Sequence, residues 1–330
     1  MKSVRFHRTG GPQELICEEL PIPSPAAGEV LIRVDVAGVN YADTIRRRGE
    51  PYPMPTPLPF NPGGEAVGVV AECGGRVDGG WIGKRVLVAL APGGGGYAQY
   101  AVAPAAMLIP LPDGLTAEHA LALHIQGLTA ALALKDAGGL MPGQSVFIEA
   151  AAGGVGSMAV QLAKLFGARQ VIAGVGSGSK RALTLELGAD AAVDYSQENW
   201  PHQVLELTGG RGVDLLLDMT CGTLLRQGTD ALAAFGRAVI YGSSDPIRHA
   251  PDLLSLVARG QSLVGFYLAL YFQHRPDVAI AMFKELAAHA MAGRLQPRIG
   301  ATLPLEEAAQ AHDLLESRES FGKIVLQAWP

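Results

Sequence analysis

A run of small residues at positions 150–156, with the sequence AAAGGVG, is the segment of this chain best suited to hold a phosphate group. It follows a short apolar strand pattern at 146–150 and precedes a helical pattern at 158–166. Glycines let a backbone approach a pyrophosphate closely, and a helix N-terminus offers open N–H groups and the positive end of a dipole. Strand, glycine turn and helix in this order predict a dinucleotide site. The competing interpretation is a tight turn that binds no ligand.

The segment after the next predicted strand, at 170–174, indicates which dinucleotide would fit. A site for NAD usually holds Asp or Glu at the end of that strand, where the carboxylate bonds the ribose 2′-hydroxyl. Here the chain continues through Ser177 to Lys180 and Arg181, and the first carboxylate is Glu186. Hydroxyl groups and cations suit a 2′-phosphate, so the sequence favours NADPH. The alternative is that Lys180 and Arg181 are solvated residues in the first turn of a helix.

Two regions with different patterns would have to position these residues. Up to about residue 122, short strand patterns such as 30–36 and 67–71 alternate with glycine and proline turns, which is typical of a small β-barrel or sandwich. Six prolines between positions 51 and 62 exclude a helix there. Beyond residue 122, strand and helix patterns alternate, which predicts an α/β fold with a doubly wound parallel sheet.

Composition and charge exclude several classes of partner. The 330 residues carry a net charge of −5, which gives no reason to expect a nucleic acid. We interpret the one basic run, at 46–48, as a solvated face. The most apolar stretch, 253–272, holds Arg259 and Gln261 near its middle. It therefore predicts a buried strand with a flanking helix rather than a membrane span.

The cysteines and the N-terminus indicate the compartment. Cys17, Cys73 and Cys221 are few and far apart, so no local zinc knuckle is expected and a reducing environment is favoured. The basic residues near the N-terminus are not followed by the apolar region of a signal peptide. We therefore expect a cytoplasmic protein.

A set of short motifs in a fixed order carries a resemblance to a known family. The motifs are Gly38-Val39-Asn40-Tyr41-Ala42-Asp43, Pro62-Gly63-Gly64-Glu65, Gly96-Tyr97-Ala98-Gln99-Tyr100, Gly127-Leu128-Thr129-Ala130, the run at 150–156 with Gln161 and Lys164 after it, Leu187-Gly188-Ala189-Asp190 and Gly322-Lys323-Ile324-Val325-Leu326. Together they resemble the zinc-free NADPH:quinone oxidoreductases (zeta-crystallin-like) of the medium-chain dehydrogenase/reductase superfamily, over essentially the whole chain.

The resemblance implies a GroES-like catalytic domain from residues 1–123 and 265–330, and a Rossmann NADPH-binding domain at 124–264. It also implies a homodimer joined along the last Rossmann strand, here 261–268. The candidate cofactor-binding residues are Asn40, Thr129, Gly153, Gly154, Val155, Gly174, Ser177, Lys180, Tyr195, Tyr241, Gly242, Ser243, Phe266 and Arg318.

The departures from zinc-dependent relatives suggest the chemistry. Those relatives place Cys where Asn40 stands and His where Gly64 stands, so we expect no metal. Without a Lewis acid, the acceptor must spread the incoming negative charge itself, as quinones and unsaturated carbonyl compounds do. The candidate polar groups at the developing oxyanion are Asn40 and Tyr41 or Tyr52, while Asp43 is expected to hold the turn at Asn40 in place.

Three functions remain open at this point. The leading hypothesis is an NADPH-dependent quinone reductase with a small-molecule acceptor. The second is an enoyl or polyenone double-bond reductase of a biosynthetic pathway, favoured by one extra residue in the segment 49–53 relative to many family members. The third is a non-catalytic NADPH-binding protein.

Overall fold

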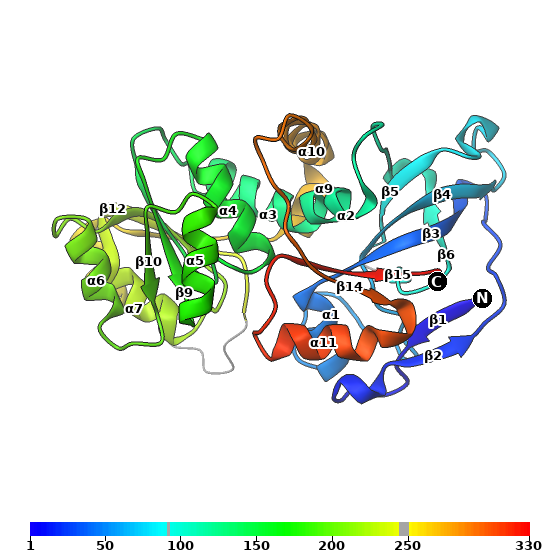
Figure 1. Cartoon of the computed structure of the whole chain (residues 1–330), viewed down its shortest axis with the longest axis horizontal. Helices are drawn as coiled ribbons and strands as arrows, with labels where there is room; N and C mark the ends of the chain where they lie inside the picture. Colours follow the sequence, from blue (N-terminus) through cyan, green and yellow to red (C-terminus); the bar gives the residue numbers. More distant parts are fainter. Residues whose placement is uncertain (91–92, 244–250) are drawn as a thin grey trace. The chain divides into compact units, whose positions relative to one another are not determined.

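The chain forms two compact units in the computed structural model, which describes residues 1–90, 93–243 and 251–330 (Figure 1). The first unit comprises Met1–Ile125 and Pro297–Pro330, and the second comprises Gln126–Gln296. Helix α10 (Pro276–Met291) packs against α3 (Leu128–Leu132) within the second unit. The domain boundaries that the family resemblance implies, at 124 and 265, stay a prediction.

The first unit is built on a seven-stranded sheet in the order β14-β15-β3-β4-β5-β7, with β6 paired to β3, beside a two-stranded sheet of β1 and β2. Its strands are β1 (Lys2–Arg5), β2 (Ile16–Glu19), β3 (Glu29–Val39), β4 (Glu65–Cys73), β5 (Arg85–Ala89), β6 (Tyr100–Pro104), β7 (Leu108–Pro110), β14 (Ile299–Pro304) and β15 (Lys323–Gln327). Its helices are α1 (Tyr41–Arg48), α2 (Ala117–Leu121) and α11 (Ala308–Glu316), with short turns η1 (Pro12–Glu14), η2 (Gly79–Trp81), η3 (Ala105–Met107) and η6 (Leu305–Glu307).

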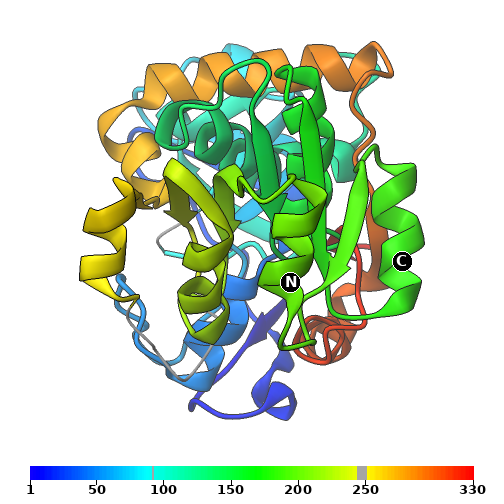
Figure 2. The same ribbon diagram turned by 90° about the vertical axis from the view of Figure 1, so that its left-hand side faces the viewer.

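The second unit contains a six-stranded parallel sheet in the order β10-β9-β8-β11-β12-β13, with helices on both faces (Figure 2). Its strands are β8 (Ser145–Ile148), β9 (Gln170–Val175), β10 (Ala191–Asp194), β11 (Val213–Asp218), β12 (Leu232–Ile240) and β13 (Ser262–Gly265). The remaining helices are α4 (Gly154–Leu165), α5 (Gly178–Glu186), α6 (Trp200–Leu207), α7 (Thr223–Ala231), α8 (Leu253–Arg259) and α9 (Leu268–His274), with π-helical turns η4 (Ala122–Gly127), which begins in the first unit, and η5 (Ala133–Ala137).

The strand order reverses between β8 and β11, which defines the place where a ligand binds in such sheets. The chain runs outward from β8 to β9 and β10, then returns to the other side of β8 to form β11. The carboxyl ends of all parallel strands meet at one edge, and a crevice opens where the order reverses. The doubly wound sheet predicted from the sequence is therefore confirmed.

The apolar strand patterns follow from burial on both sheet faces. All of β8 is buried, and Phe147 stacks on Trp200 of α6 with ring centroids 4.8 Å apart. A strand covered on both faces needs continuous apolar residues rather than alternation. This core fixes the strand from which the glycine turn begins.

The basic run at 46–48 was wrongly interpreted as a solvated face. Arg47 is fully buried, donates to the Gly10 carbonyl (2.8 Å) and to His312 Nδ1 (3.2 Å), and forms an ion pair with Glu316. Arg46 lies with its guanidinium carbon 4.0 Å from the Phe60 ring centroid. Buried arginines are tolerated because partners distant in the sequence satisfy the guanidinium donors.

The apolar stretch 253–272 also differs from its prediction. Among the strands that the structure describes, β13 pairs with β12 alone, so it is an edge strand whose ends, Ser262 and Gly265, are exposed. Helix α8 exposes Leu253, and short helix α9 follows. Among the helices that the structure describes, none has the length and hydropathy needed to cross a bilayer.

Candidate functional site

The glycine turn after β8 folds back on itself so tightly that a side chain would not fit at Gly156. A Cβ there would lie 2.2 Å from the Ala150 carbonyl oxygen. Gly153 caps α4 in an extended conformation and donates its N–H to Ala150 (2.8 Å). The next N–H groups belong to the first turn of α4, which has no preceding helical carbonyl to bond. This cradle fits the pyrophosphate of a dinucleotide.

The connection from β9 to α5 lies beside the glycine turn. Ser177 caps α5, and its hydroxyl oxygen lies 3.2 Å from that of Ser179. Gly174 faces the Tyr195 ring, since a Cβ at Gly174 would come within 3.0 Å of it. Lys180 follows in the first turn of α5. Ser177 and Tyr195 therefore follow the ends of the adjacent strands β9 and β10, and Lys180 lies in the helix that Ser177 caps.

Asp194 is an acidic side chain at the end of β10, where it pairs with Val175 of β9. Its carboxylate accepts hydrogen bonds from the N–H and hydroxyl of Ser196 (2.9 and 2.6 Å). These bonds, with a smaller contribution from Arg181, lower the pKa of Asp194. The carboxylate is thus tied to its own turn on the third strand, and the end of β9 itself carries none.

The other predicted cofactor residues of the second unit also follow strand ends. Tyr241 donates its N–H to the Asp218 carbonyl (2.9 Å), and Gly242 packs on Met219, whose carbonyl lies 2.4 Å from a Cβ built at Gly242. Ser243 comes next, and Phe266 follows β13. The second-unit candidates thus share one sheet edge, except Thr129, which lies in α3 against α4. Asn40 and Arg318 belong to the first unit.

A buried polar cluster surrounds Asn40 in the first unit. Lys323 donates to the Val39 carbonyl (3.1 Å), Asn40 Oδ1 (2.9 Å) and Glu65 Oε1 (2.5 Å). Asn40 Nδ2 donates to Glu65 Oε1 (3.0 Å), and His124 Nδ1 lies 2.8 Å from Glu65 Oε2. The side chains of Glu65 and Lys323 are 0 % exposed. The cluster therefore joins β4, β15 and the start of α1.

The charges of this cluster fix the orientation of the Asn40 amide. Burial opposes ionisation of Glu65, but Lys323 and His124 outweigh it and lower the pKa of Glu65 to about 2. Glu65 is therefore a carboxylate that accepts from Nδ2, while Lys323 can only donate and so faces Oδ1. One N–H of the Asn40 amide has no role in these two bonds, so Asn40 can act toward a substrate as a donor.

The prediction that Asp43 holds the turn at Asn40 is confirmed. Asp43 Oδ2 accepts from the Asn40 N–H (3.0 Å), which forms a capping box at the start of α1. Its carboxylate also accepts from the Gly63 N–H (3.2 Å) and the Tyr97 hydroxyl (3.3 Å). Asp43 thereby ties Asn40 to the segment before β4.

The two tyrosines proposed as polar groups lie on arginines. The Arg48 guanidinium carbon is 5.4 Å from the Tyr41 ring centroid, and Arg48 donates to the Tyr41 hydroxyl (3.5 Å). The Arg46 guanidinium carbon is 5.4 Å from the Tyr52 ring centroid. Both tyrosines are partly exposed. Tyr41 follows Asn40 directly in α1, whereas Tyr52 lies in the proline-rich loop.

Known proteins match this chain over nearly its full length. Residues 26–113 match the alcohol dehydrogenase GroES-like domain, and residues 154–285 match the zinc-binding dehydrogenase model. Quinone oxidoreductase of Sus scrofa is 33 % identical, with 99 % of this chain and 97 % of that protein covered. 2-Haloacrylate reductase of a Burkholderia species is 35 % identical, with 97 % of each covered. The chain belongs to the zinc-free quinone oxidoreductase-like family of the medium-chain dehydrogenase/reductases.

The fold of this family member matches solved relatives. Quinone oxidoreductase of Escherichia coli, solved in complex with NADPH, superposes with a TM-score of 0.91 at 29 % identity, with 99 % of this chain and 100 % of that chain covered. The pairing of a GroES-like domain with a Rossmann-type parallel sheet, predicted from the sequence, is therefore confirmed.

The donor set of this family member does not fit a zinc ion, although one matched model is named for zinc binding. In the part of the chain that the structure describes, no group of three His, Cys, Asp or Glu side chains is placed to hold a metal. The carboxylate of Glu65 is already bound by the Lys323 ammonium and by His124. We therefore derive no step through a metal.

Glu65, Lys323 and His124 were missed as a cluster by sequence reasoning. In the sequence, Glu65 and Lys323 stand out only as parts of motifs. A signal was present, because Glu65 and Lys323 each directly precede an apolar run within a strand, at 66–71 and 324–326, where a buried charge requires a partner. What the sequence lacks is the identity of that partner.

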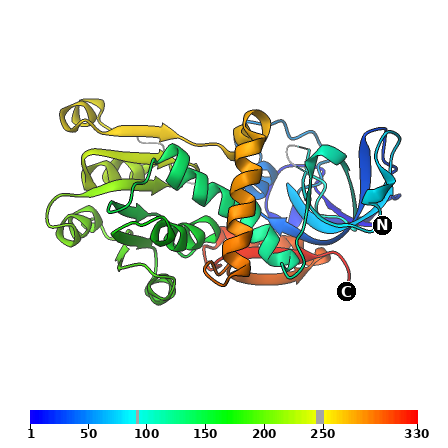
Figure 3. The ribbon, with the colours of Figure 1, turned by 90° about the horizontal axis from the view of Figure 1, so that it is seen from above.

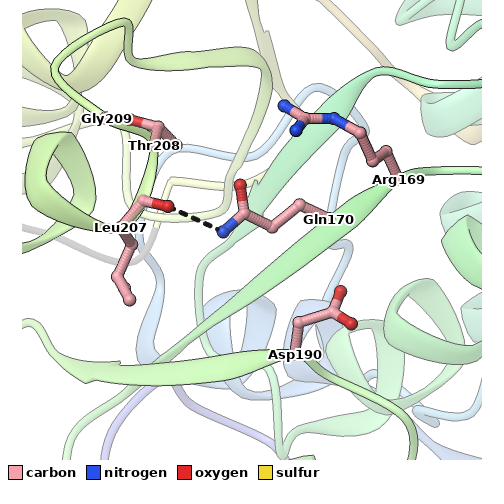
Figure 4. Close-up of a pocket in the computed structure, with 6 residues that line it drawn as sticks. All are labelled: Arg169, Gln170, Asp190, Leu207, Thr208 and Gly209. Carbon is pink, nitrogen blue, oxygen red and sulfur yellow. Dashed lines mark hydrogen bonds between the residues drawn. The ribbon is translucent and has the colours of Figure 1, made fainter.

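A hollow of about 500 Å³ lies at the opposite edge of the second unit's sheet (Figure 4). It is lined by Arg169, Gln170, Asp190, Leu207, Thr208 and Gly209. Gln170 opens β9, and Asp190 directly precedes β10, so the hollow lies at the amino ends of these strands. It is therefore separate from the cofactor cradle.

Proposed function

We propose that this protein is an NADPH-dependent quinone oxidoreductase that transfers hydride to a quinone-like acceptor without zinc. The observation that carries the proposal is the full-length similarity to quinone oxidoreductases in a chain that keeps the glycine cradle at the carboxyl edge. Bound NADPH would supply the hydride. The chain's own residues would bind the cofactor, orient the acceptor beside it and polarise the acceptor's carbonyl group.

The cofactor is held by residues of the carboxyl edge. Gly154 and Val155 bind the pyrophosphate through the open N–H groups of the first turn of α4, and Gly153, whose own N–H is bonded to the Ala150 carbonyl, has no side chain to keep the phosphate away. Ser177 and Lys180, with Tyr195, surround the 2′-phosphate. The remaining contacts come from Asn40, Thr129, Gly174, Tyr241, Gly242, Ser243, Phe266 and Arg318.

The acceptor delocalises the negative charge that it gains from the hydride, and one oriented hydrogen-bond donor of the protein stabilises that charge. The Asn40 amide, fixed by Lys323 and Glu65, keeps an N–H for the oxygen on which charge develops. Tyr41 and Tyr52 are further polar groups for the acceptor. A quinone suits this site because its two conjugated carbonyls delocalise the charge that a metal stabilises in other dehydrogenases.

The acceptor class is tested by comparing kcat/KM for quinones, unsaturated ketones and 2-haloacrylates with NADPH as donor. The proposal predicts the highest value for a quinone. The 35 % identity to 2-haloacrylate reductase favours a second candidate, reduction of a carbon–carbon double bond conjugated to a carbonyl. A higher kcat/KM for those acceptors selects it. Tight NADPH binding without oxidation by any acceptor selects the non-catalytic alternative.

Replacing Lys180 and Arg181 by alanine is expected to weaken NADPH binding about 10- to 100-fold and NADH binding hardly at all. The reason is that charge-assisted bonds to the 2′-phosphate contribute roughly 1.5–3 kcal/mol. Titration calorimetry with both cofactors measures the effect. The control is Arg169→Ala at the opposite edge, which should leave both affinities unchanged. Equal losses for NADPH and NADH contradict a 2′-phosphate site here.

We propose a homodimer joined along β13. This strand forms the outer edge of the sheet (Figure 3), and α8, which leads into it, exposes Leu254 (78 %) and Val257 (77 %), while Phe235 is 85 % exposed. An open strand edge next to apolar side chains favours pairing with a second copy.

Changing Leu254 and Val257 to glutamate is expected to convert the dimer to a monomer, because four buried charges would face one another across the twofold interface. Sedimentation velocity measures the mass of each species. Ile82→Glu, an exposed apolar position in the first unit, is the control and should stay dimeric. A monomeric wild type, or a double variant that stays dimeric, contradicts the proposed interface.

We also propose a cytoplasmic location, which rests on the sparse cysteines. Fractionation of cells that express the full chain tests it, and recovery outside the cytoplasmic fraction contradicts it.

A further inference from the structure

Two carboxyl side chains meet beneath the cofactor edge of the second unit. Glu149 follows β8 directly and leads into the glycine turn, while Asp218 ends the adjacent strand β11. Glu149 is 1 % exposed and Asp218 is 0 % exposed. Ile148 of β8 and Leu217 of β11 are register partners, so the two carboxyl side chains leave neighbouring positions at the same edge of the sheet. A hydrogen bond between the two groups requires a proton, because two carboxylates have only acceptors.

The hydrogen bonds around the pair show which carboxyl carries that proton. Asp218 accepts from the Cys221 N–H (2.7 Å) and the Thr220 hydroxyl (3.1 Å), which stabilise a negative charge. Glu149 Oε2 accepts a longer bond from the Met219 N–H (3.2 Å). Glu149 Oε1 is buried and meets no donor among the described residues. An unpartnered oxygen beside a carboxylate is satisfied when it bears a proton and donates it.

The groups that face the pair do not favour a second negative charge. The strongest influences on Glu149 are burial and Asp218, which raise its pKa well above the ordinary value, and Met219 and Thr220, which oppose them. None of these is a cation. Tyr241 follows the end of β12. Burial, and to a smaller extent the charges of the two carboxyl groups and of Tyr195, raise the pKa of its phenol, so the phenol stays neutral.

We infer that Glu149 is a positioning residue of the cofactor cradle: its side chain keeps a proton at neutral pH and donates it to Asp218, which ties the glycine turn to the loop after β11. The cofactor role of this edge rests on the proposed function. The tie leaves the pair with one negative charge instead of two beneath a turn that receives an anionic pyrophosphate.

Loss of this proton to solvent at alkaline pH has a defined consequence. Two buried carboxylates then repel each other where the ends of β8 and β11 must stay together. The native state loses stability between the ordinary pKa of Glu149, 4.5, and its raised value in the fold, because the unfolded chain binds fewer protons in that window. NADPH affinity falls once the pH passes the raised value, since the cradle gains a charge that repels pyrophosphate.

Infrared spectroscopy of the full chain without cofactor tests the proton directly. Wild-type protein at neutral pH is expected to show the C=O stretch of a buried protonated carboxyl, and Glu149→Gln is expected to lack it. Glu198→Gln, at an exposed position, is the control and should keep the band. The inference is overturned if the wild type lacks the band or if Glu149→Gln retains it.

NADPH affinity measured from about pH 7 to about pH 10 tests the positioning role. Above the pH at which the band titrates, the Kd of the wild type is expected to rise up to tenfold per pH unit. Glu149→Gln, whose amide still donates to Asp218, is expected to bind NADPH well with a flatter profile. Identical profiles overturn the role. Absence of NADPH binding in both proteins contradicts the proposed function, whereas the infrared band still reports the proton.

Asp218→Asn provides a second variant if Glu149→Gln does not fold. It removes the neighbouring charge, so the Glu149 band should titrate at a lower pH than in the wild type. A titration midpoint that stays in place or moves upward overturns the inference.

Discussion

Replacing Lys323 by methionine is expected to destabilise the protein by about 3–5 kcal/mol, the largest loss of any single change considered for the first unit. The ammonium of Lys323 is fully buried and donates hydrogen bonds to the Val39 carbonyl, Asn40 Oδ1 and Glu65 Oε1. Its removal leaves the Glu65 carboxylate buried without its main counter-charge. Urea unfolding measures the free energy of unfolding.

The control for this change is Lys164→Met, which breaks the half-exposed pair of Lys164 with Asp190 (2.8 Å). Exposed pairs contribute up to about 1 kcal/mol, so this loss should be small. Adding Glu65→Gln to Lys323→Met should recover part of the lost stability, because the orphaned charge is gone. A loss at Lys323 no greater than at Lys164 contradicts the role assigned to the buried cluster.

Gly156→Ala is expected to lower NADPH affinity about 10- to 100-fold and the free energy of unfolding by about 1–3 kcal/mol. The new methyl group would lie 2.2 Å from the Ala150 carbonyl oxygen and 2.6 Å from the Ala151 Cα. Both are backbone atoms of the turn, so the cradle itself has to move. Calorimetric titration with NADPH and urea unfolding measure the two effects.

Gly79→Ala is the matched control for this change. Within the described residues, no atom lies within 4 Å of a Cβ built at Gly79. We expect stability and NADPH affinity close to those of the wild type. If Gly156→Ala behaves like this control, the turn is not the cofactor cradle.

The elements near the cofactor edge could be predicted because their signals are local. The run at 150–156 lies between a buried strand and a helix, and the segment from Ser177 to Arg181 lacks a carboxylate. Glycine spacing, apolar runs and capping residues act within a few positions, so sequence shows them directly. Asp43, three positions after Asn40, was expected to hold the turn at Asn40 for the same reason.

The polar clusters could not be predicted because their partners are far apart in the chain. Lys323 bonds Glu65 across 258 positions, and Arg47 meets Glu316 across 269. Glu149 and Asp218 meet only because β11 returns beside β8, which strand patterns alone do not specify. A charged residue in an apolar segment indicates that a partner exists, and the fold decides which one.

The misjudged surfaces have the same origin. The run at 46–48 looks solvated in sequence because three cations are costly to bury, and two partners of Arg47, His312 and Glu316, come from the distant α11. Strand β13 looks fully buried because it is apolar, yet it has a neighbour on one side only. Whether an edge strand is buried depends on the order of the strands in the sheet, or on a second copy of the chain that pairs with it.

The most direct test of the central claim is NADPH oxidation by a quinone, followed by stopped flow with chelator-treated protein whose zinc content has been measured. The account predicts that NADPH is consumed in proportion to the quinone, at a rate that chelation does not change, by protein without stoichiometric zinc. No oxidation of NADPH with any quinone, or a stoichiometric zinc ion whose removal abolishes turnover, contradicts it.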